Sequence, residues 1–274
     1  MNRKMRPHPS TAAPRGLINR LQTALKVSTI AGALALVAAP AAMADVITFD
    51  DMTPNTFTSG VTLHAPYFNL GLVEGPMAAY FGLVGATGVI ANGSDANACD
   101  IASCPVGASG NYLGILNDGG LTISLDGSRG VGFTLDRLNF AFLAPFGLFD
   151  GSYGQLQLNG TDWSGNAITR SFNLPGQDTH GNFIFDTALL DAAFTSTVLT
   201  RITINACVNS DDGCVNSLDF PAMNQAQFAL DDISVNVVPE PASGLLFMLG
   251  LGALGMTARR RAAAPSTPLV AEGI

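Results

Sequence analysis

Short stretches of the chain alternate between apolar and polar residues, which is the pattern of a β-strand with one buried face. Leu121, Ile123 and Leu125, for example, are separated by threonine and serine. Glycine, asparagine, threonine and serine outnumber glutamate, lysine and glutamine, a balance that favours strands and turns over helices. We therefore predict an all-β fold, an antiparallel β-sandwich of about ten strands that is jelly-roll-like. The clearest predicted strands are 46–49, 121–126, 131–142, 156–158, 168–172, 197–206 and 228–237, and 62–72 is expected to contain one or two short strands.

Other stretches predict shorter or less regular elements. Residues 159–166 contain Asn-Gly and Ser-Gly-Asn between two strands, which indicates a hairpin with a longer loop. Residues 183–185 predict a short strand, and 187–194 predict one or two helical turns. The apolar, glycine-punctuated segment 78–90 is compatible with either a strand or a loop.

In two of the predicted strands the alternation slips by one residue. The slips fall near Asp136–Arg137 and at Asp231–Asp232. A slip of this kind requires a bulge or a bend, because otherwise the later side chains would turn to the wrong face. The first and last strands of a jelly roll often pair, so we expect Asp50–Asp51 to lie near Asp231–Asp232.

The N-terminal segment, 1–44, has the organisation of a secretory signal peptide. Six Lys or Arg residues and no acid precede an apolar core over 27–39, and Ala42 and Ala44 form an A-x-A cleavage site. No twin-arginine pair precedes the core, which favours export by the Sec machinery. An amphipathic helix of the mature fold is the alternative.

Near the C-terminus, 17 residues from Ala242 to Ala258 carry no charge. As a helix they would span roughly 25 Å, close to the ~30 Å of a bilayer core. The run predicts a single transmembrane helix, and Arg259, Arg260 and Arg261 place its end in the cytoplasm by the positive-inside rule. Residues 262–274 would then be a short cytoplasmic tail. A buried core helix with a basic end is the alternative.

The segment 238–261 resembles the PEP-CTERM sorting signal of Gram-negative bacteria. The resemblance rests on Val238, Pro239, Glu240 and Pro241, the apolar run, and the arginines after it. It implies recognition by an exosortase and cleavage near Pro239–Pro241. The precursor would be anchored in the inner membrane, and the product would reach the cell surface or the exopolysaccharide matrix. One departure is that 13 residues follow the arginines.

The segment between the two sorting elements, 45–237, is strongly acidic. It holds four arginines, no lysine and 19 acids, which gives a net charge of 4 − 19 = −15. Such a charge argues against binding to nucleic acid or anionic lipid. It suits calcium or a hydrated matrix, and it equally suits a protein kept soluble by its charge.

All four cysteines, Cys99, Cys104, Cys207 and Cys214, lie in the part predicted to be exported. An even number in an oxidising compartment indicates disulfides. Three pairings are possible, and we favour two local bridges, Cys99–Cys104 and Cys207–Cys214.

Calcium is the cofactor that the acidic residues suit best, because it takes six to eight oxygen ligands. Asp50, Asp51, Asp231 and Asp232 could supply several of them. The alternative is that these carboxylates are solvated turn residues or backbone caps.

Trp163, in the predicted hairpin loop, is the single tryptophan of the chain. An aromatic ring at a loop tip can stack on a sugar. The alternative, which we favour, is that the ring folds back over the edge of the sheet.

A second resemblance concerns Gln227-Phe228-Ala229-Leu230-Asp231, which is similar to the motif of a Gln-Phe-x-x-Asp subgroup of PEP-CTERM proteins. That subgroup implies no activity. It resembles, more loosely, the jelly-roll domains of carbohydrate-binding modules, in which a structural calcium joins the terminal strands.

Catalytic motifs are missing from the sequence, which contains neither G-x-S-x-G nor H-E-x-x-H. We therefore expect no enzyme, but a structural or adhesive protein of the surface or matrix. Its expected partners are the exosortase, the Sec machinery, the membrane before processing, and exopolysaccharide or other matrix components. A calcium-dependent carbohydrate-binding module is the first alternative, and a secreted glycan hydrolase is the second.

Overall fold

The alternating segments form strands, and the apolar side of each strand is buried. In β9 (Gly154–Asp162), Leu156 and Leu158 are fully buried, whereas Gln157 and Asn159, which alternate with them, are partly exposed. The structure is a computed structural model that describes residues 43–76, 80, 85–95, 104–128, 130–143, 153–210, 213–216, 225–239 and 250–252. The other elements are β1 (Met43–Ile47), β2 (Asn55–Thr58), β3 (Thr62–Ala65), β4 (Phe68–Val73), β5 (Ala86–Asn92), β6 (Asn111–Ile115), β7 (Gly120–Leu125), β8 (Gly132–Phe142), β10 (Ala167–Asn173), β11 (Asp186–Leu189), α3 (Ala192–Ser196), β12 (Leu199–Ser210), β13 (Gly213–Val215) and β14 (Phe228–Val238).

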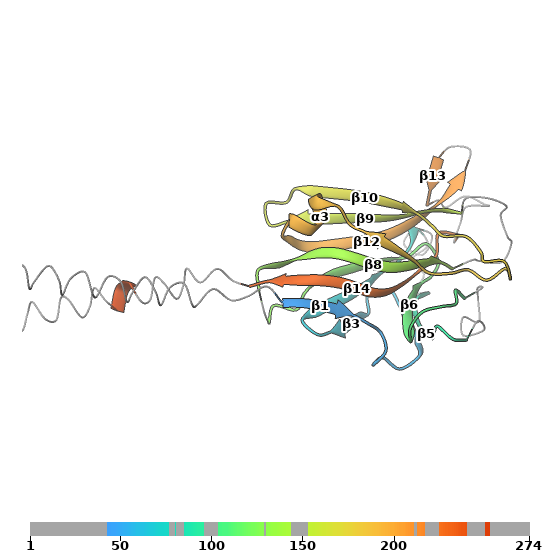
Figure 1. Cartoon of the computed structure of the whole chain (residues 1–274), viewed down its shortest axis with the longest axis horizontal. Coiled ribbons are helices and arrows are strands. Elements are labelled where there is room, and N and C mark those ends of the chain that lie inside the picture. Colours follow the sequence, from blue (N-terminus) through green and yellow to red (C-terminus); the bar gives the residue numbers. More distant parts are fainter. Residues whose placement is uncertain are drawn as a thin grey trace, which may run out of the picture. The chain divides into compact units, whose positions relative to one another are not determined.

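The named strands pair antiparallel and form two layers (Figure 1). The first layer has the order β3-β4-β7-β12-β9-β10. The second has the order β2-β5-β6-β14-β8-β11, and β1 also pairs with β14. One residue pair, Leu199 with Phe133, links the layers into a single curled sheet. The predicted all-β, antiparallel, sandwich-like architecture is confirmed.

The core lies between the two layers and is rich in phenylalanine. Phe68 of the first layer and Phe133 of the second are fully buried, and their rings meet edge to face with centroids 5.4 Å apart. Full burial of one such side chain contributes about 1.5–3 kcal/mol. The inward side chains of both layers therefore hold the sandwich together, and the outward positions need not be apolar.

The two predicted slips are confirmed, and they form a single irregularity. In the ladder between β14 and β8, Asp231 pairs with Asn139, Ser234 with Arg137, and Val235 with Leu135. The register therefore shifts once on each strand. Asp232 takes a left-handed backbone conformation, with φ of 47°, as expected of a residue at a bulge.

The first and last strands also pair as predicted, with Val46 opposite Ser234 and Met43 opposite Val237. Cleavage after Ala44 would remove the first two residues of β1 and leave Asp45–Ile47 in the ladder. The rest of the predicted signal peptide lies outside the described residues.

Some predicted boundaries are wrong. The β9–β10 hairpin has no long loop, since its ladder continues to Thr161 opposite Ala167 and only 163–166 form the turn. Residues 187–189, predicted to be helical, belong to β11, because they pair with the edge of β8. Residues 183 and 184 form isolated bridges and no strand.

The chain divides into two units, 41–240 and the terminal segments 1–40 with 241–274. The strands belong to the first unit. Of the second, the structure describes only 250–252, which are helical. Otherwise the predicted membrane helix 242–258 and the tail 262–274 lie outside the described residues. Within the described ranges, no helix has the length and apolar character needed to cross a membrane.

Candidate functional site

The outer side of the first layer is a polar face made mostly of uncharged side chains. Inward positions carry leucine, isoleucine and phenylalanine, and outward positions carry mainly threonine, serine, asparagine and glutamine. Arg201 is the only Lys, Arg, Asp or Glu at the outward positions of these six strands. The pairing register aligns one full row across the face: Thr62, Gly71, Thr122, Thr203, Asn159 and Thr169.

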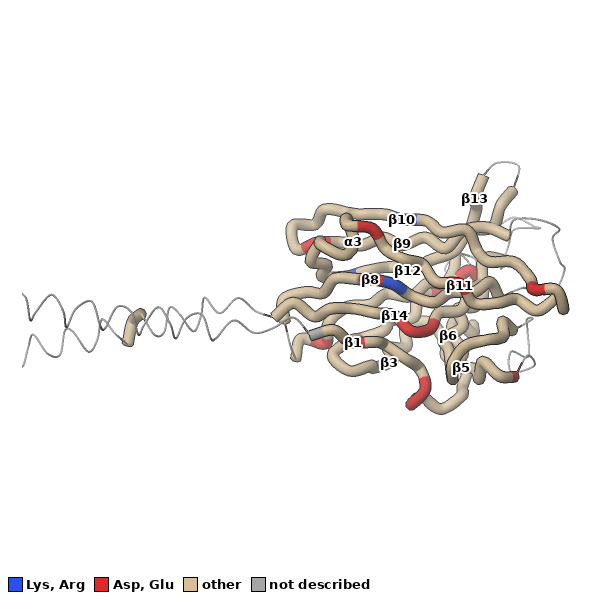
Figure 2. The backbone as a smooth tube through the Cα atoms, viewed as in Figure 1, with Lys and Arg blue, Asp and Glu red and all other residues tan. Residues whose placement is uncertain are grey.

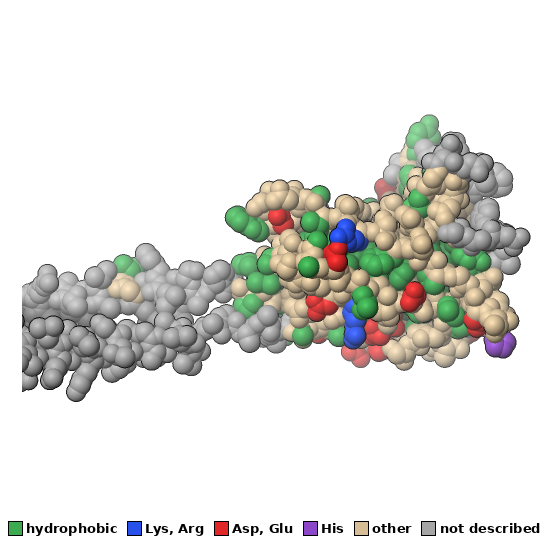
Figure 3. Space-filling model, turned by 45° about the horizontal axis from the view of Figure 1, so that its top comes forward, with side chains coloured by type: hydrophobic (Ala, Val, Ile, Leu, Met, Phe, Trp, Pro, Cys, Tyr) green, Lys and Arg blue, Asp and Glu red, His purple; other side chains and the backbone are tan. Residues whose placement is uncertain are grey.

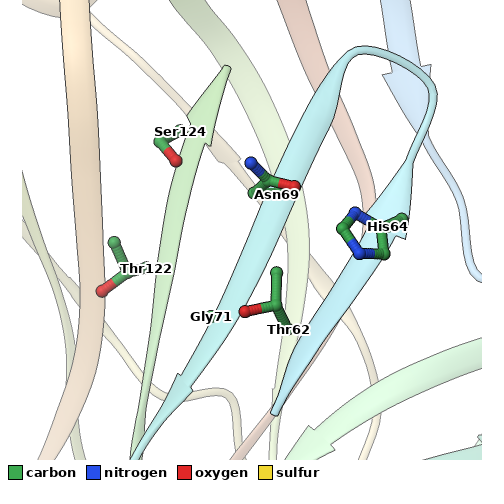
Figure 4. Close-up of a pocket in the computed structure, with 6 residues that line it drawn as sticks. All are labelled: Thr62, His64, Asn69, Gly71, Thr122 and Ser124. Atoms are coloured by element: carbon green, nitrogen blue, oxygen red, sulfur yellow. The ribbon is translucent and has the colours of Figure 1, made fainter. Parts of the chain in front are cut away.

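A hollow of about 540 Å³ lies on this face over β3, β4 and β7 (Figure 4). Gly71 explains where the hollow forms, because this residue lies between Thr62 and Thr122 in the row and has no side chain. A Cβ atom added at Gly71 would meet nothing closer than 3.9 Å. The space above β4 is therefore open. The residues that line the hollow are Thr62, His64, Asn69, Gly71, Thr122 and Ser124.

The polar groups of the hollow are available to a ligand. Within the described part of the chain, the side chains of Asn69, Thr122 and Ser124 make no intramolecular hydrogen bond. Hydroxyl and amide groups both donate and accept hydrogen bonds, so together they can match a ligand rich in hydroxyl groups. The lining contains no carboxylate, and its one ring is the imidazole of His64.

The four aspartates predicted to bind calcium are brought together only in part. Asp231 is buried, with 2% of its surface exposed, whereas Asp50 and Asp51 lie in an exposed turn after β1. Burial, together with the nearby carboxylates of Asp232 and Asp50, raises the pKa of Asp231 to about 6. Asp50 and Asp232 are thus close enough to Asp231 for their charges to interact.

Three of these carboxylates, those of Asp50, Asp231 and Asp232, also have a partner in the protein. Asp50 Oδ1 accepts a hydrogen bond from the backbone N–H of Asn111 at 2.9 Å, and Asp231 Oδ1 accepts one from the N–H of Asp232 at 2.9 Å. Asp232 Oδ2 accepts one from Asn139 Nδ2 at 3.1 Å. Among the described residues, no three His, Cys, Asp or Glu side chains are grouped so as to hold a metal ion. These hydrogen bonds form without a metal ion, and calcium binding stays a prediction.

The Gln-Phe-x-x-Asp motif has a structural role at the start of β14. Gln227 is buried, and its Oε1 accepts a hydrogen bond from the N–H of Asn117 at 3.0 Å. Phe228 lies in the core, and Asp231 is the buried carboxylate at the bulge. The two polar residues of the motif therefore satisfy backbone groups, which buried donors require. Likeness to the subgroup itself stays a prediction.

One predicted disulfide is confirmed. Cys207 and Cys214 are bonded, with Cα atoms 5.3 Å apart, and they close the hairpin of β12 and β13. Cys104 is buried, but Cys99 lies outside the described residues, so the second pairing stays a prediction.

Trp163 does not fold back over the sheet, which corrects the favoured prediction. The indole is 80% exposed at the tip of the β9–β10 hairpin. Asp162 holds this tip through hydrogen bonds of 2.8 Å from the N–H groups of Ser164 and Asn166, and Asn166 Nδ2 donates a third at 2.9 Å. These contacts use the polar groups of the turn and leave the ring outside.

Of the sorting residues, Val238 ends β14 and Pro239 follows it directly. Glu240, Pro241 and Arg259–Arg261 lie outside the described residues, as does Ala42. Ala44 is in β1 opposite Asn236. The folded unit therefore leads into the sorting segment without an intervening linker.

In the part of the chain that the structure describes, the acidic residues lie on many separate turns and strands. Figure 2 shows carboxylates on turns and strands in several places, with few basic residues among them. Figure 3 shows them scattered over the face turned to the viewer. The Arg170 guanidinium pairs with Asp191 at the start of α3. Charge is thus a general property of this surface, and the neutral polar face is the exception.

The polar face was missed from the sequence. Its signal was present, because threonine, serine and asparagine occupy every second position of several predicted strands. The alternation identifies the buried side of each strand, but it does not show which outward residues of different strands are neighbours. Only the register shows that these residues adjoin and that Gly71 opens a hollow among them.

Several solved structures are weakly similar to the chain, and no curated protein sequence matches it. An arabinose-bound MgGH51 α-L-arabinofuranosidase is 12% identical, with 69% of this chain and 25% of that one covered and a TM-score of 0.30. TmCBM61 in complex with β-1,4-galactotriose is 10% identical, with coverages of 61% and 80% and a TM-score of 0.26. A cyclase from Fischerella sp. TAU is 12% identical, with coverages of 73% and 100% and a TM-score of 0.31. The chain spans a quarter of the first of these proteins, and likeness at this level identifies no function.

The comparison with family models bears on the end of the chain. Residues 237–261 match the model of the PEP-CTERM protein-sorting motif. The match covers the Val-Pro-Glu-Pro residues, the apolar run and the arginines on which the resemblance was based. The sorting motif is thereby confirmed, and it implies an exported, membrane-passing protein that an exosortase processes.

Proposed function

We propose that this chain is a non-catalytic, adhesive protein of the cell surface or extracellular matrix, whose polar face binds a neutral polysaccharide. The observation that carries the proposal is the hollow over Gly71, lined by hydroxyl and amide groups that have no partner of their own in the described structure. We also propose that the two layers follow a jelly-roll order and that the host is a Gram-negative bacterium.

The chemistry of the face favours a neutral glycan. The segment 45–237 carries a net charge of 4 − 19 = −15, so an anionic polymer would be repelled as it approached. A neutral sugar meets no such barrier, and its hydroxyl groups can exchange hydrogen bonds with Asn69, Thr122 and Ser124. Glycoside hydrolysis needs two carboxyl groups beside the scissile bond, and the lining of the hollow supplies none.

The test is the mobility of the full chain, purified in detergent, in native gels that contain a neutral galactan, dextran or anionic alginate. We expect retardation by at least one neutral polymer and none by alginate. Gly71→Gln should abolish it, because the new side chain fits the backbone and occupies the open space above β4 between Thr62 and Thr122. Val73→Gln is the matched control, since Val73 is 43% exposed on the same strand and face but does not line the hollow.

Two results would refute the proposal: no retardation by either neutral polymer, or retardation that Gly71→Gln leaves unchanged. Trp163→Ala in the same gels tests the predicted stacking of Trp163 on a sugar. Loss of binding with this variant alone would move the site from the hollow to the hairpin tip.

A further inference from the structure

The hairpin that carries Trp163 lies at the same end of the folded unit as the exit of the chain into its sorting segment. Figure 1 shows the β9–β10 turn and the C-terminal end of β14 at one end of the strands. The pairing register gives the same result. Asp162 is opposite Leu199, Leu199 is opposite Phe133, and Phe133 is opposite Val237.

Trp163 and Val238 therefore both adjoin that row, because each is the next residue along the chain from a member of it. Three strand spacings of about 4.8 Å separate their strands along the row. Val131 lies at the same end, where its N–H donates to the carbonyl oxygen of Val238 at 3.0 Å, and it is 48% exposed. This end thus presents two exposed apolar side chains, one of them the only tryptophan of the chain.

The distance from this end to the start of the apolar run is short. Four residues lead from Val238 to Ala242, and two of them are Pro239 and Pro241. In a polyproline conformation four residues span about 12 Å. The headgroup layer on each side of a bilayer is roughly 5–8 Å thick. If Ala242 enters the hydrocarbon, the end of the folded unit that carries Val238, which we call the exit end, lies only a few ångströms above the headgroups. A protruding indole can cross that gap.

We infer that Trp163 is a membrane-interface contact of the uncleaved precursor, inserted among the headgroups of a zwitterionic bilayer. Tryptophan favours this layer because its ring is apolar and its N–H can still bond with water or headgroups. Asp126 and Asp162 lie at the same end, so anionic headgroups would oppose the contact. The contact would fix the orientation of the folded unit over the membrane while the sorting enzyme acts. The inference rests on the sorting segment spanning the membrane and is independent of glycan binding.

The experiment uses the full chain in phosphatidylcholine vesicles, where all tryptophan fluorescence comes from Trp163. Flotation first shows whether the chain is anchored. Emission is then compared between plain vesicles and vesicles whose lipids carry bromine near the top of the acyl chains. We expect emission to shift to shorter wavelength on anchoring and to be lost to the brominated lipid. Anionic lipid in the vesicles should weaken both effects.

The matched control moves the fluorophore to another exposed site, with Trp163→Tyr combined with Leu189→Trp. Leu189 is 71% exposed and pairs with Arg137, four residues along β8 from Phe133 and roughly 13 Å farther from the exit end. Its emission should be unaffected by brominated lipid.

Three outcomes would overturn the inference. If the anchored chain shows no quenching at Trp163, the exit end does not contact the lipid. A shift in Trp163 emission seen only with added exosortase would assign the hairpin tip to a protein partner. If both positions are quenched, the unit lies on its side. If the chain does not float with the vesicles, the predicted span is wrong, and the contact is wrong with it.

Discussion

Replacement of Asp231 by asparagine should change how stability depends on pH. Asp231 is buried with its carboxylate near those of Asp232 and Asp50, and its pKa is raised from 3.8 to about 6. The folded state therefore binds the Asp231 proton more tightly than the unfolded state does. Stability from this group is fully present below pH 3.8 and is lost as pH rises through 6. The full loss corresponds to about 3 kcal/mol at 1.36 kcal/mol per pKa unit.

The assay is urea unfolding of the full chain in EDTA at pH 4.5 and pH 7.5. Between these two values the linkage relation predicts a loss of about 2 kcal/mol from Asp231. Asp231→Asn keeps an oxygen that can accept from the N–H of Asp232, but it cannot titrate and should lack that loss. The free energy of unfolding of the variant minus that of wild type should therefore be about 2 kcal/mol higher at pH 7.5 than at pH 4.5.

Asp51→Asn is the matched control, because it removes the same charge from the exposed turn. If the free energies of unfolding of wild type and Asp231→Asn differ by the same amount at both pH values, burial does not raise the pKa of Asp231 and the reasoning is refuted. Calcium added at pH 7.5 then tests the predicted metal site. A site in the native state at 100 times its Kd adds about 2.7 kcal/mol, and this gain must vanish in Asp231→Asn if these carboxylates bind the ion.

Two further substitutions test the disulfide of the β12–β13 hairpin and the hydrogen bond of Gln227. Substitution of both Cys207 and Cys214 with alanine removes their disulfide and should cost roughly 2.5 kcal/mol of stability for so short a loop. Calorimetry should then show a fall in Tm of roughly 5–10 °C. An unchanged Tm would show that the hairpin of β12 and β13 is stable without the bond. Gln227→Met keeps the volume but leaves the partly buried backbone N–H of Asn117, in the β6–β7 turn, without its acceptor, at a cost of about 1 kcal/mol in urea unfolding. Equal stability of this variant and wild type would remove the proposed structural role of the motif.

The strands and the β14–β8 irregularity could be predicted because period-two alternation records which side of a strand is buried. A slip in that alternation at Asp231–Asp232 has no other simple explanation than an extra residue in the ladder. The confirmed pairing of the first and last strands followed from the fold class. Residues 187–189 resisted prediction, since a short edge strand buries little and its sequence resembles a helical turn.

The hollow and the exposed tryptophan could not be predicted, because both depend on contacts between distant residues. Gly71 opens a hollow only because the register places it between Thr62 and Thr122. Trp163 stays exposed because Asp162 holds the turn, and because the strands run on to that turn and leave no long loop to fold back.

The position of β14 has a mechanical consequence. This strand has β8 on one side and β1 and β6 on the other, and its last residue leads directly to the sorting segment. A pull transmitted through Val238 therefore acts along the axis of a central strand. Antiparallel ladder bonds lie perpendicular to that axis, so the load shears many of them at once, whereas a peeled edge strand would lose them one by one. While the tail is attached, tension from the sorting segment is therefore carried by a strand that is paired on both sides.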